Sequence, residues 1–324
     1  MIASCGSVEP QLVELCVEGN GTMIEEITFE ASDGFPLSGK LFHGSGNKPL
    51  VLISSATAVP QGFYAAFAKH LIAEGARAVL TYDYRGVAAS RRARKAVPEI
   101  RFRDWAIQDF PAALHRLQAV APGHEMVGIG QSFGGQALGV SGASDAFSRY
   151  GMVATMSGAM HLLDDKWAWP RMNIVGVPVS YLTPSMPRWM NGEPIPGSVF
   201  RDWARWCRMK NYFFDDPQLG AADLIAKVKT PILSVGLEDD PWGTRRAVSH
   251  FLSYHTSAPI EQLWYSPADA EGQPIGHLGF FRSRFAQSLW PEMTEWLLDG
   301  VSPSSQDHLS KSGKPAMESS TTSA

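Results

Sequence analysis

A serine lies between two glycines at positions 130–134, where the chain reads Gly-Gln-Ser-Phe-Gly. A short apolar segment that is typical of a strand precedes this pentapeptide, and small residues with helical character follow it. A serine on such a sharp strand-to-helix turn has strained backbone geometry, and side chains in place of either glycine would collide with the adjoining strand or helix. The pattern predicts a nucleophile elbow with Ser132 as the nucleophile. The alternative is a tight turn in which Ser132 only caps a helix.

A serine nucleophile needs a base, and the base needs an acid that fixes its tautomer. With this motif, the acid and then the histidine follow the serine, each after a strand. His277 lies between Gly and Leu in the loop that follows a predicted strand at 260–265, and we expect it to be the base. His124 precedes its strand and lies at the wrong end of the sheet. His161 begins a segment without strand signals, where a substrate contact or a structural role is expected.

Three carboxylates, Glu238, Asp239 and Asp240, follow the predicted strand at 231–237. We expect Asp239 to be the acid because its position matches the usual length of this turn. Asp240 is the alternative; if Asp239 is the acid, Asp240 is expected to cap the next helix.

An oxyanion hole completes this chemistry. The backbone N–H of Phe133, which follows the nucleophile, is expected to be one donor. The second is expected from the loop after a predicted strand at 49–54, where Ala56 or Thr57 can supply it.

The elements that must position these groups alternate between strand and helix. Strands are predicted at 24–30, 37–42, 49–54, 77–84, 126–130, 152–156, 231–237 and 260–265, and helices at 61–74, 104–120 (with Asp104 as N-cap), 133–142, 222–228, 244–255 and 280–298. The first two strands form a hairpin around an Asp-Gly turn. This order predicts an α/β fold with a mostly parallel central sheet, helices on both faces and ligand sites at the carboxyl ends of the strands.

The alternation fails in one long segment that is rich in Trp, Met and Pro. We predict an N-terminal extension at 1–22, a core in two parts at 23–158 and 221–301, a cap inserted over the cleft at 159–220, and a disordered tail at 302–324. Most aromatic residues of the cap are expected to form its own core, and a few are expected to face the substrate.

Composition limits the classes of function. The 324-residue chain is 44% hydrophobic with a formal net charge of -4, which gives no electrostatic footprint for nucleic acid, and no apolar run is long enough to span a membrane. The three cysteines lack metal-ligand spacing, and the first ten residues do not form a secretory signal. We therefore expect a soluble protein of the reducing cytoplasm with a small-molecule acyl substrate. No metal or organic cofactor is implied, and homo-oligomer formation is left open.

From about residue 25 to residue 300 the chain resembles the α/β-hydrolase superfamily, and within it the serine-aminopeptidase-like and monoglyceride-lipase-like branch of predicted serine hydrolases. The resemblance is carried by the segments 81–86 (with Ser90), 130–135, 236–242 and 276–281. It implies the α/β-hydrolase fold, with Ser132 as nucleophile, Asp239 as acid and His277 as base.

Two departures from the family pattern stand out. Ala88 occupies a position where the family often has a second glycine, and Ala58 with Val59 replaces a more glycine-rich oxyanion loop. A basic run at 91–95 follows the first of these positions. A solvated loop is the default interpretation of this run, and recognition of an acidic substrate group is the alternative.

These residues together predict a serine esterase or lipase-like hydrolase that forms an acyl-enzyme at a carboxylic ester or related acyl group. A peptidase or amidase, or an acyltransferase, would use the same three side chains. A non-catalytic ligand-binding α/β protein is the alternative from another class; the presence of all three side chains argues against it.

Overall fold

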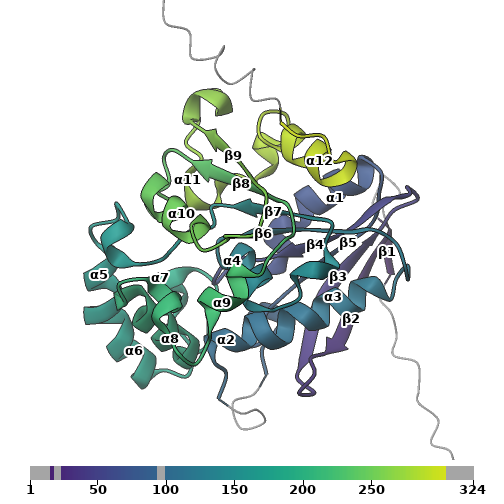
Figure 1. The fold of residues 1–324 in the computed structure, drawn as a ribbon. Helices are drawn as coiled ribbons and strands as arrows, with labels where there is room; N and C mark the ends of the chain where they lie inside the picture. The colour runs from purple at the N-terminus through teal and green to yellow at the C-terminus, as the bar shows by residue number, and fades with distance from the viewer. Residues whose placement is uncertain (1–14, 18–22, 93–98, 304–324) are drawn as a thin grey trace, which may run out of the picture.

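The computed structural model describes residues 15–17, 23–92 and 99–303. Within these residues, nine strands form one sheet in the order β1-β2-β3-β5-β4-β6-β7-β8-β9 (Figure 1). The strands are β1 Leu15–Val17, β2 Met23–Glu30, β3 Pro36–His43, β4 Lys48–Ser54, β5 Ala76–Tyr82, β6 Met126–Gln131, β7 Arg149–Val153, β8 Ile232–Leu237 and β9 Ile260–Tyr265. Along this order, the first three pairs (β1-β2, β2-β3 and β3-β5) are antiparallel. All the following pairs, from β5-β4 to β8-β9, are parallel.

The α-helices of the described residues lie mostly between the strands. They are α1 Ala65–Ala73, α2 Phe102–Asp104, α3 Phe110–Gln118, α4 Phe133–Val140, α5 Ala168–Pro170, α6 Val177–Leu182, α7 Arg188–Asn191, α8 Gly197–Arg208, α9 Ala221–Ala226, α10 Arg245–Leu252, α11 Gly276–Gly279 and α12 Trp290–Asp299. Short 3-10 or π-helical turns join several of them; among these, η1 covers Gln61–Tyr64 and η4 covers Trp105–Asp109.

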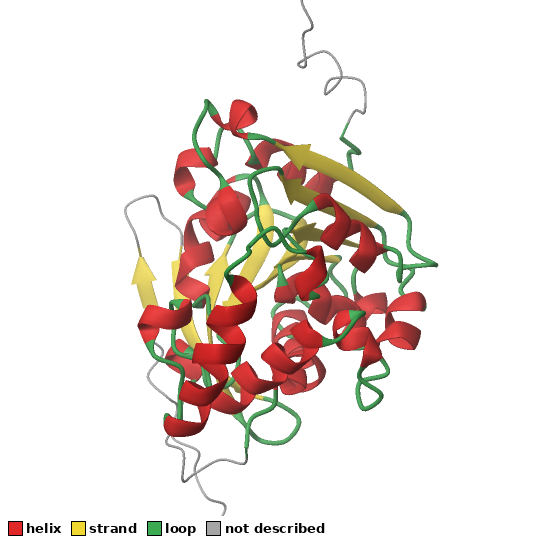
Figure 2. Ribbon diagram, turned by 90° about the vertical axis from the view of Figure 1, so that its left-hand side faces the viewer, coloured by secondary structure: helices red, strands yellow, loops and turns green. Residues whose placement is uncertain are grey.

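Helices cover both faces of the sheet (Figure 2). The central strands are apolar at successive positions, so neighbouring side chains enter opposite layers. In β4, Leu50 and Leu52 join the layer that contains α3, α4, α9 and α10, whereas Val51 and Ile53 join the layer that contains α1 and α12. The continuous apolar run of β4 is thus explained by burial on both faces, as the sequence predicts.

The predicted strands and most helices are confirmed, with three differences. β7 begins at Arg149, three residues before the predicted start. Asp104 is not an N-cap, because the helical region already begins at Phe102 and the Asp104 carboxylate accepts a hydrogen bond from the Arg101 N–H at 2.7 Å. The predicted final helix at 280–298 is interrupted, and α12 begins only at Trp290.

The predicted extension at 1–22 contains a strand. β1 pairs with β2 at the edge of the sheet, with Cys16 opposite Ile24. Residues 1–14 and 18–22 lie outside the described residues, as do residues 304–324 of the predicted disordered tail.

Helices α5 to α8 occupy the inserted segment, by which we mean residues 159–220, between β7 and β8. They lie together beside α2 in Figure 1. An ion pair of 2.7 Å joins Asp202 on α8 to Arg101, and the rings of Trp206 and Phe102 stack with centroids 5.1 Å apart. These contacts hold α8 against the core beside α2.

The loop after β5 is fixed by buried polar groups. The Arg85 guanidinium, whose side chain is 4% exposed, pairs with Asp109 at 2.6 Å and with Asp33 at 2.7 Å.

Two alanines that depart from the family pattern have a positive φ. Ala88, in the loop after β5, has a φ of 35°, and Ala58, in the loop after β4, has a φ of 61°. Both alanines thus adopt the left-handed conformation that favours glycine.

Candidate active site

The elbow at Ser132 has the predicted backbone geometry. Ser132 has φ 51° and ψ -112° between the end of β6 and the start of α4. A Cβ on Gly130 would lie 2.2 Å from the carbonyl carbon of Gly134, and a Cβ on Gly134 would lie 2.1 Å from the backbone oxygen of Ser54. Only glycine fits at either position, so the steric explanation of the motif is confirmed for this chain.

Ser132 and His277 line the same cavity, which has a volume of about 490 Å³. The Ser132 side chain is nearly buried, and its hydroxyl contacts Met156 Sδ at 4.0 Å. The Ser132 N–H donates to the carbonyl of Val153 at 2.9 Å, which anchors the elbow to β7. The structure thus brings the predicted nucleophile and the predicted base to one cleft.

The carboxylate that contacts His277 is Asp240, not Asp239. Nδ1 of His277 lies 2.6 Å from Oδ2 of Asp240, whose side chain is fully buried. The expectation for Asp239 is therefore corrected, and the alternative residue is the partner of the imidazole. Because Asp240 contacts Nδ1, the other ring nitrogen, Nε2, is left for proton exchange.

Asp239 has a different set of partners. Its two carboxylate oxygens accept the backbone N–H groups of Ile275 and Gly276 at 2.8 and 2.9 Å, so it holds the loop that carries His277. The expected capping role of Asp240 is also corrected, because the Thr244 side chain caps α10 by accepting the Ala247 N–H at 3.2 Å. The residue in contact with His277 thus lies one position after the one that the turn length favours.

The surroundings of Asp240 keep it ionised. Burial alone would raise the pKa of Asp240, but the charge and hydrogen bond of His277 and the backbone N–H groups of Gly243 and Trp242 hold that pKa below its ordinary value. A Cβ at Gly243 would lie 2.3 Å from Oδ2 of Asp240, so glycine is required there. Asp240 is therefore a buried, ionised carboxylate that contacts Nδ1 of His277.

The two predicted oxyanion-loop donors differ in availability. The Ala56 N–H donates to the Tyr64 hydroxyl at 2.8 Å and is therefore engaged. The N–H groups of Thr57 and Phe133 have no acceptor among the described residues, and both residues line the cavity. Of the two candidates after β4, the structure leaves Thr57 free to bind an oxyanion.

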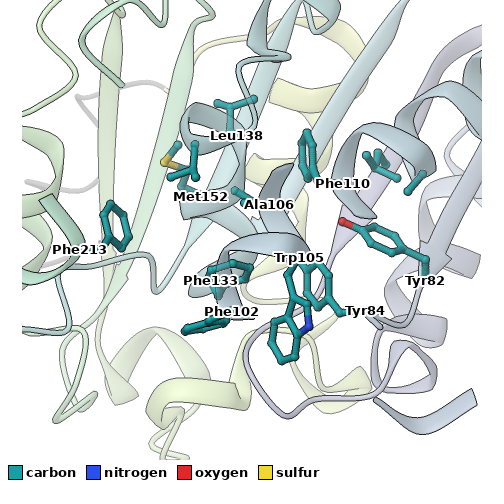
Figure 3. Close-up of a cluster of buried hydrophobic side chains, with 14 of the residues drawn as sticks. Tyr82, Tyr84, Phe102, Trp105, Ala106, Phe110, Phe133, Leu138, Met152 and Phe213 are labelled. Carbon is teal, nitrogen blue, oxygen red and sulfur yellow. The ribbon is translucent and has the colours of Figure 1, made fainter. Parts of the chain in front are cut away.

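The Phe133 side chain lies in an aromatic cluster with Phe102 and Trp105 (Figure 3). Its ring stacks on Phe102 with centroids 4.4 Å apart and meets the edge of Trp105 at 5.7 Å. This packing fixes the first turn of α4 and with it the direction of the Phe133 N–H.

Two aromatic residues of the inserted segment, Trp203 and Tyr212, line the cavity. Trp203 lies on α8, and its ring centroid is 5.6 Å from that of Trp242 in the core. By contrast, Trp167 and Trp189 are 74% and 72% exposed. Sequence periodicity could not separate these groups, because the separation depends on how the helices of the inserted segment dock on the core.

The other polar residues considered from the sequence, where the structure describes them, do not contact His277 or Asp240. His124 contacts the Asn47 carbonyl at 3.1 Å, and His161 is exposed. In the basic run, Arg91 pairs with Glu193 at 2.7 Å, and residues 93–95 lie outside the described residues. No group of three or more His, Cys, Asp or Glu side chains that could hold a metal ion occurs within the part of the chain that the structure describes.

Several residues of this site could not be found from a sequence motif. Tyr64, Met156 and Trp242 lie within or beside the cleft, although they are remote from one another in sequence. Gln131 could have been noticed as the variable residue before the serine. Its side chain is fully buried and donates to the His277 carbonyl at 2.8 Å.

No helix of the described residues combines the length and the apolar character needed to cross a membrane. Comparison of the sequence with protein-family models and with curated proteins finds no match. Solved structures, in contrast, match over most of the chain.

The structure of DcsB in complex with its substrate analogue is 15% identical, with a TM-score of 0.58 over 85% of this chain and 98% of that one. The α/β hydrolase GrgF from Penicillium sp. is 17% identical, with a TM-score of 0.54 over 85% of this chain and 99% of that one. A monoacylglycerol lipase from Paleococcus ferrophilus is 14% identical, with a TM-score of 0.54 over 82% and 99%. The fold expected from the sequence is confirmed: this chain has the fold of the α/β-hydrolase superfamily.

Proposed function

We propose that the protein is a serine hydrolase that cleaves a carboxylic ester or a related acyl compound, with Ser132 as nucleophile, His277 as base and Asp240 as acid. The observation that carries the proposal is the 2.6 Å contact between His277 and Asp240 beside a cavity that Ser132 also lines. A strained serine and a carboxylate-oriented histidine in one cleft are the parts that acyl transfer requires.

The first step is activation of the serine. The Ser132 hydroxyl turns from Met156 towards Nε2 of His277, gives up its proton and attacks the acyl carbon. Asp240 stabilises the resulting imidazolium through Nδ1. The oxyanion of the tetrahedral intermediate accepts hydrogen bonds from the N–H groups of Phe133 and Thr57.

The intermediate then collapses to an acyl-enzyme. His277 returns the proton to the leaving alcohol, and the bond between the acyl carbon and that alcohol breaks. Water, deprotonated by the same imidazole, releases the acid and restores Ser132. Apart from this water, the groups that act on the substrate in these steps are side chains and backbone N–H groups of this chain.

The walls of the cavity suit an apolar acyl or alcohol group. Its lining includes the apolar surfaces of Trp203, Trp242, Phe63 and Met156. We propose that the inserted segment acts as the cap of this site, since Trp203 comes from it and its Glu193 N–H donates to the Ala58 carbonyl at 3.2 Å.

The experiment is turnover of p-nitrophenyl esters from acetate to octanoate by the purified protein. We expect Ser132→Ala and His277→Ala to lower kcat at least about 10³-fold, whereas His161→Ala, a control at an exposed histidine, leaves it unchanged. A folded wild-type protein that hydrolyses no ester, or a Ser132→Ala variant with full activity, would contradict the proposal.

A further inference from the structure

Two buried hydrogen bonds and one partly buried hydrogen bond beside the cleft take no direct part in the steps above. The Ala56 N–H donates to the Tyr64 hydroxyl at 2.8 Å, and that hydroxyl donates to Oε1 of Gln131 at 2.7 Å. Nε2 of Gln131 then donates to the His277 carbonyl at 2.8 Å. We call this series the Gln131 relay; Tyr64 and Gln131 are both fully buried.

The relay joins three separate segments of the fold. Ala56 lies in the loop after β4, Gln131 is the last residue of β6 and precedes Ser132, and His277 lies on α11. Tyr64, in η1, also packs its ring against Phe281 with centroids 4.9 Å apart. The oxyanion loop, the nucleophile and the base are therefore linked through side chains of two residues.

The two ends of the relay fix its direction. The Ala56 N–H can only donate, so the Tyr64 hydroxyl must accept it and give its own proton to the next group. The His277 carbonyl can only accept, so the group beside it must donate. A glutamine supplies both an acceptor and a donor, and a flipped amide would set its oxygen against the His277 carbonyl.

We propose that Gln131 and Tyr64 are positioning residues that hold the His277 backbone and the oxyanion loop in register with Ser132. This inference rests on the proposed hydrolase function. It also assigns the oxyanion donor after β4 to Thr57, because Tyr64 occupies the N–H of Ala56. Burial raises the pKa of Tyr64, so its hydroxyl keeps the proton that the relay needs at neutral pH.

The test compares Tyr64→Phe and Gln131→Met with the matched control Tyr82→Phe. Tyr82 is also fully buried, and its hydroxyl contacts Ser54 Oγ at 3.2 Å outside the relay. Tyr64→Phe removes two buried hydrogen bonds and Tyr82→Phe removes one, so we expect the melting temperature to fall in both variants and to fall further in Tyr64→Phe. We expect kcat per fluorophosphonate-titrated site to fall about tenfold in Tyr64→Phe and about 10- to 100-fold in Gln131→Met, with KM within about twofold.

A fourth variant, Gln131→Glu, gives a readout that a merely structural role would not move. When protonated, the glutamic acid retains both an acceptor and a donor; when ionised, it repels the His277 carbonyl. We expect the ratio of its kcat to that of the wild type to fall as pH rises from 6 to 9, while the ratio for Gln131→Met stays flat.

The proposal is overturned if kcat per titrated site in Tyr64→Phe and Gln131→Met stays within twofold of wild type, or if Tyr82→Phe loses as much. A loss of activity that only follows the loss of titratable sites overturns it as well. Failure of the hydrolase function gives a different result, because the wild type itself would then neither react with the fluorophosphonate nor turn over an ester.

Discussion

Replacing Asp240 and Asp239 separately by asparagine tests which carboxylate serves His277. In Asp240→Asn, the side-chain amide that faces Nδ1 can donate a hydrogen bond, which favours the imidazole tautomer with its proton on Nε2. That tautomer cannot accept the proton of Ser132. The buried carboxylate 2.6 Å from Nδ1 is also lost as a counter-charge for the imidazolium. Loss of a triad carboxylate in this way costs about 10⁴-fold in kcat, which corresponds to about 5 kcal/mol.

Asp239→Asn is the matched neighbour. Asp239 accepts two backbone N–H groups, from Ile275 and Gly276, and an asparagine can still accept one of them through its carbonyl oxygen. The loss of one such hydrogen bond costs about 1 to 2 kcal/mol of loop stability. Even if all of it appears in the barrier, kcat falls by about tenfold or slightly more.

The assay is p-nitrophenyl butyrate hydrolysis at saturating substrate, with urea unfolding of each variant to show that it is folded. We expect Asp240→Asn to lose at least about 100 times more activity than Asp239→Asn. A larger loss in Asp239→Asn than in Asp240→Asn, with both variants folded, would refute the assignment of Asp240.

Three further predictions concern other parts of the fold. Gly134→Ala places a Cβ 2.1 Å from a backbone oxygen and should lower the free energy of unfolding by about 3 kcal/mol or more. At Gly62 nothing lies within 4 Å of an added Cβ, so Gly62→Ala should change that free energy by less than about 0.5 kcal/mol. Equal urea midpoints of the two variants would contradict this. Burial lowers the pKa of His255 to about 4, below its ordinary value. The free energy of unfolding should therefore decrease by about 2 kcal/mol as the pH falls from 7 to 5, and His255→Leu should remove this decrease. Parallel pH profiles of the two proteins would refute this prediction. Trp203→Ala should lower kcat/KM about tenfold for p-nitrophenyl hexanoate and by a smaller factor for p-nitrophenyl acetate. The control Trp167→Ala, at an exposed residue, should leave both values of kcat/KM unchanged. Equal effects of the two substitutions would contradict the cavity assignment.

Much of the fold could be predicted because the hydrophobic patterns match the burial. The apolar run of β4 is buried on both faces, and the alternation at the end of β2 places Ile27 and Phe29 in one core layer. The elbow could be predicted from glycines whose added Cβ atoms would meet backbone atoms. In these places a local pattern is sufficient, because steric contacts within or next to the segment decide the conformation.

The remaining features depend on contacts between distant segments. Asp239 and Asp240 are neighbours of one residue type, and only the position of residues 275–277 across the sheet edge decides which of them meets the imidazole. The same holds for Trp203, whose direction is set by the docking of α8 on α2. The Gln131 relay joins residues 56, 64, 131 and 277, which no periodicity connects.

Covalent labelling is the most direct test of whether Ser132 is the nucleophile of a hydrolase. The purified protein is treated with a fluorophosphonate, digested, and the modified peptide is located by mass spectrometry, with Ser132→Ala treated in parallel. We expect one modification, on Ser132, that appears at the same rate as ester hydrolysis disappears and is absent from the variant. A folded wild-type protein that stays unlabelled, or a label on another residue that accompanies the loss of activity, would contradict it.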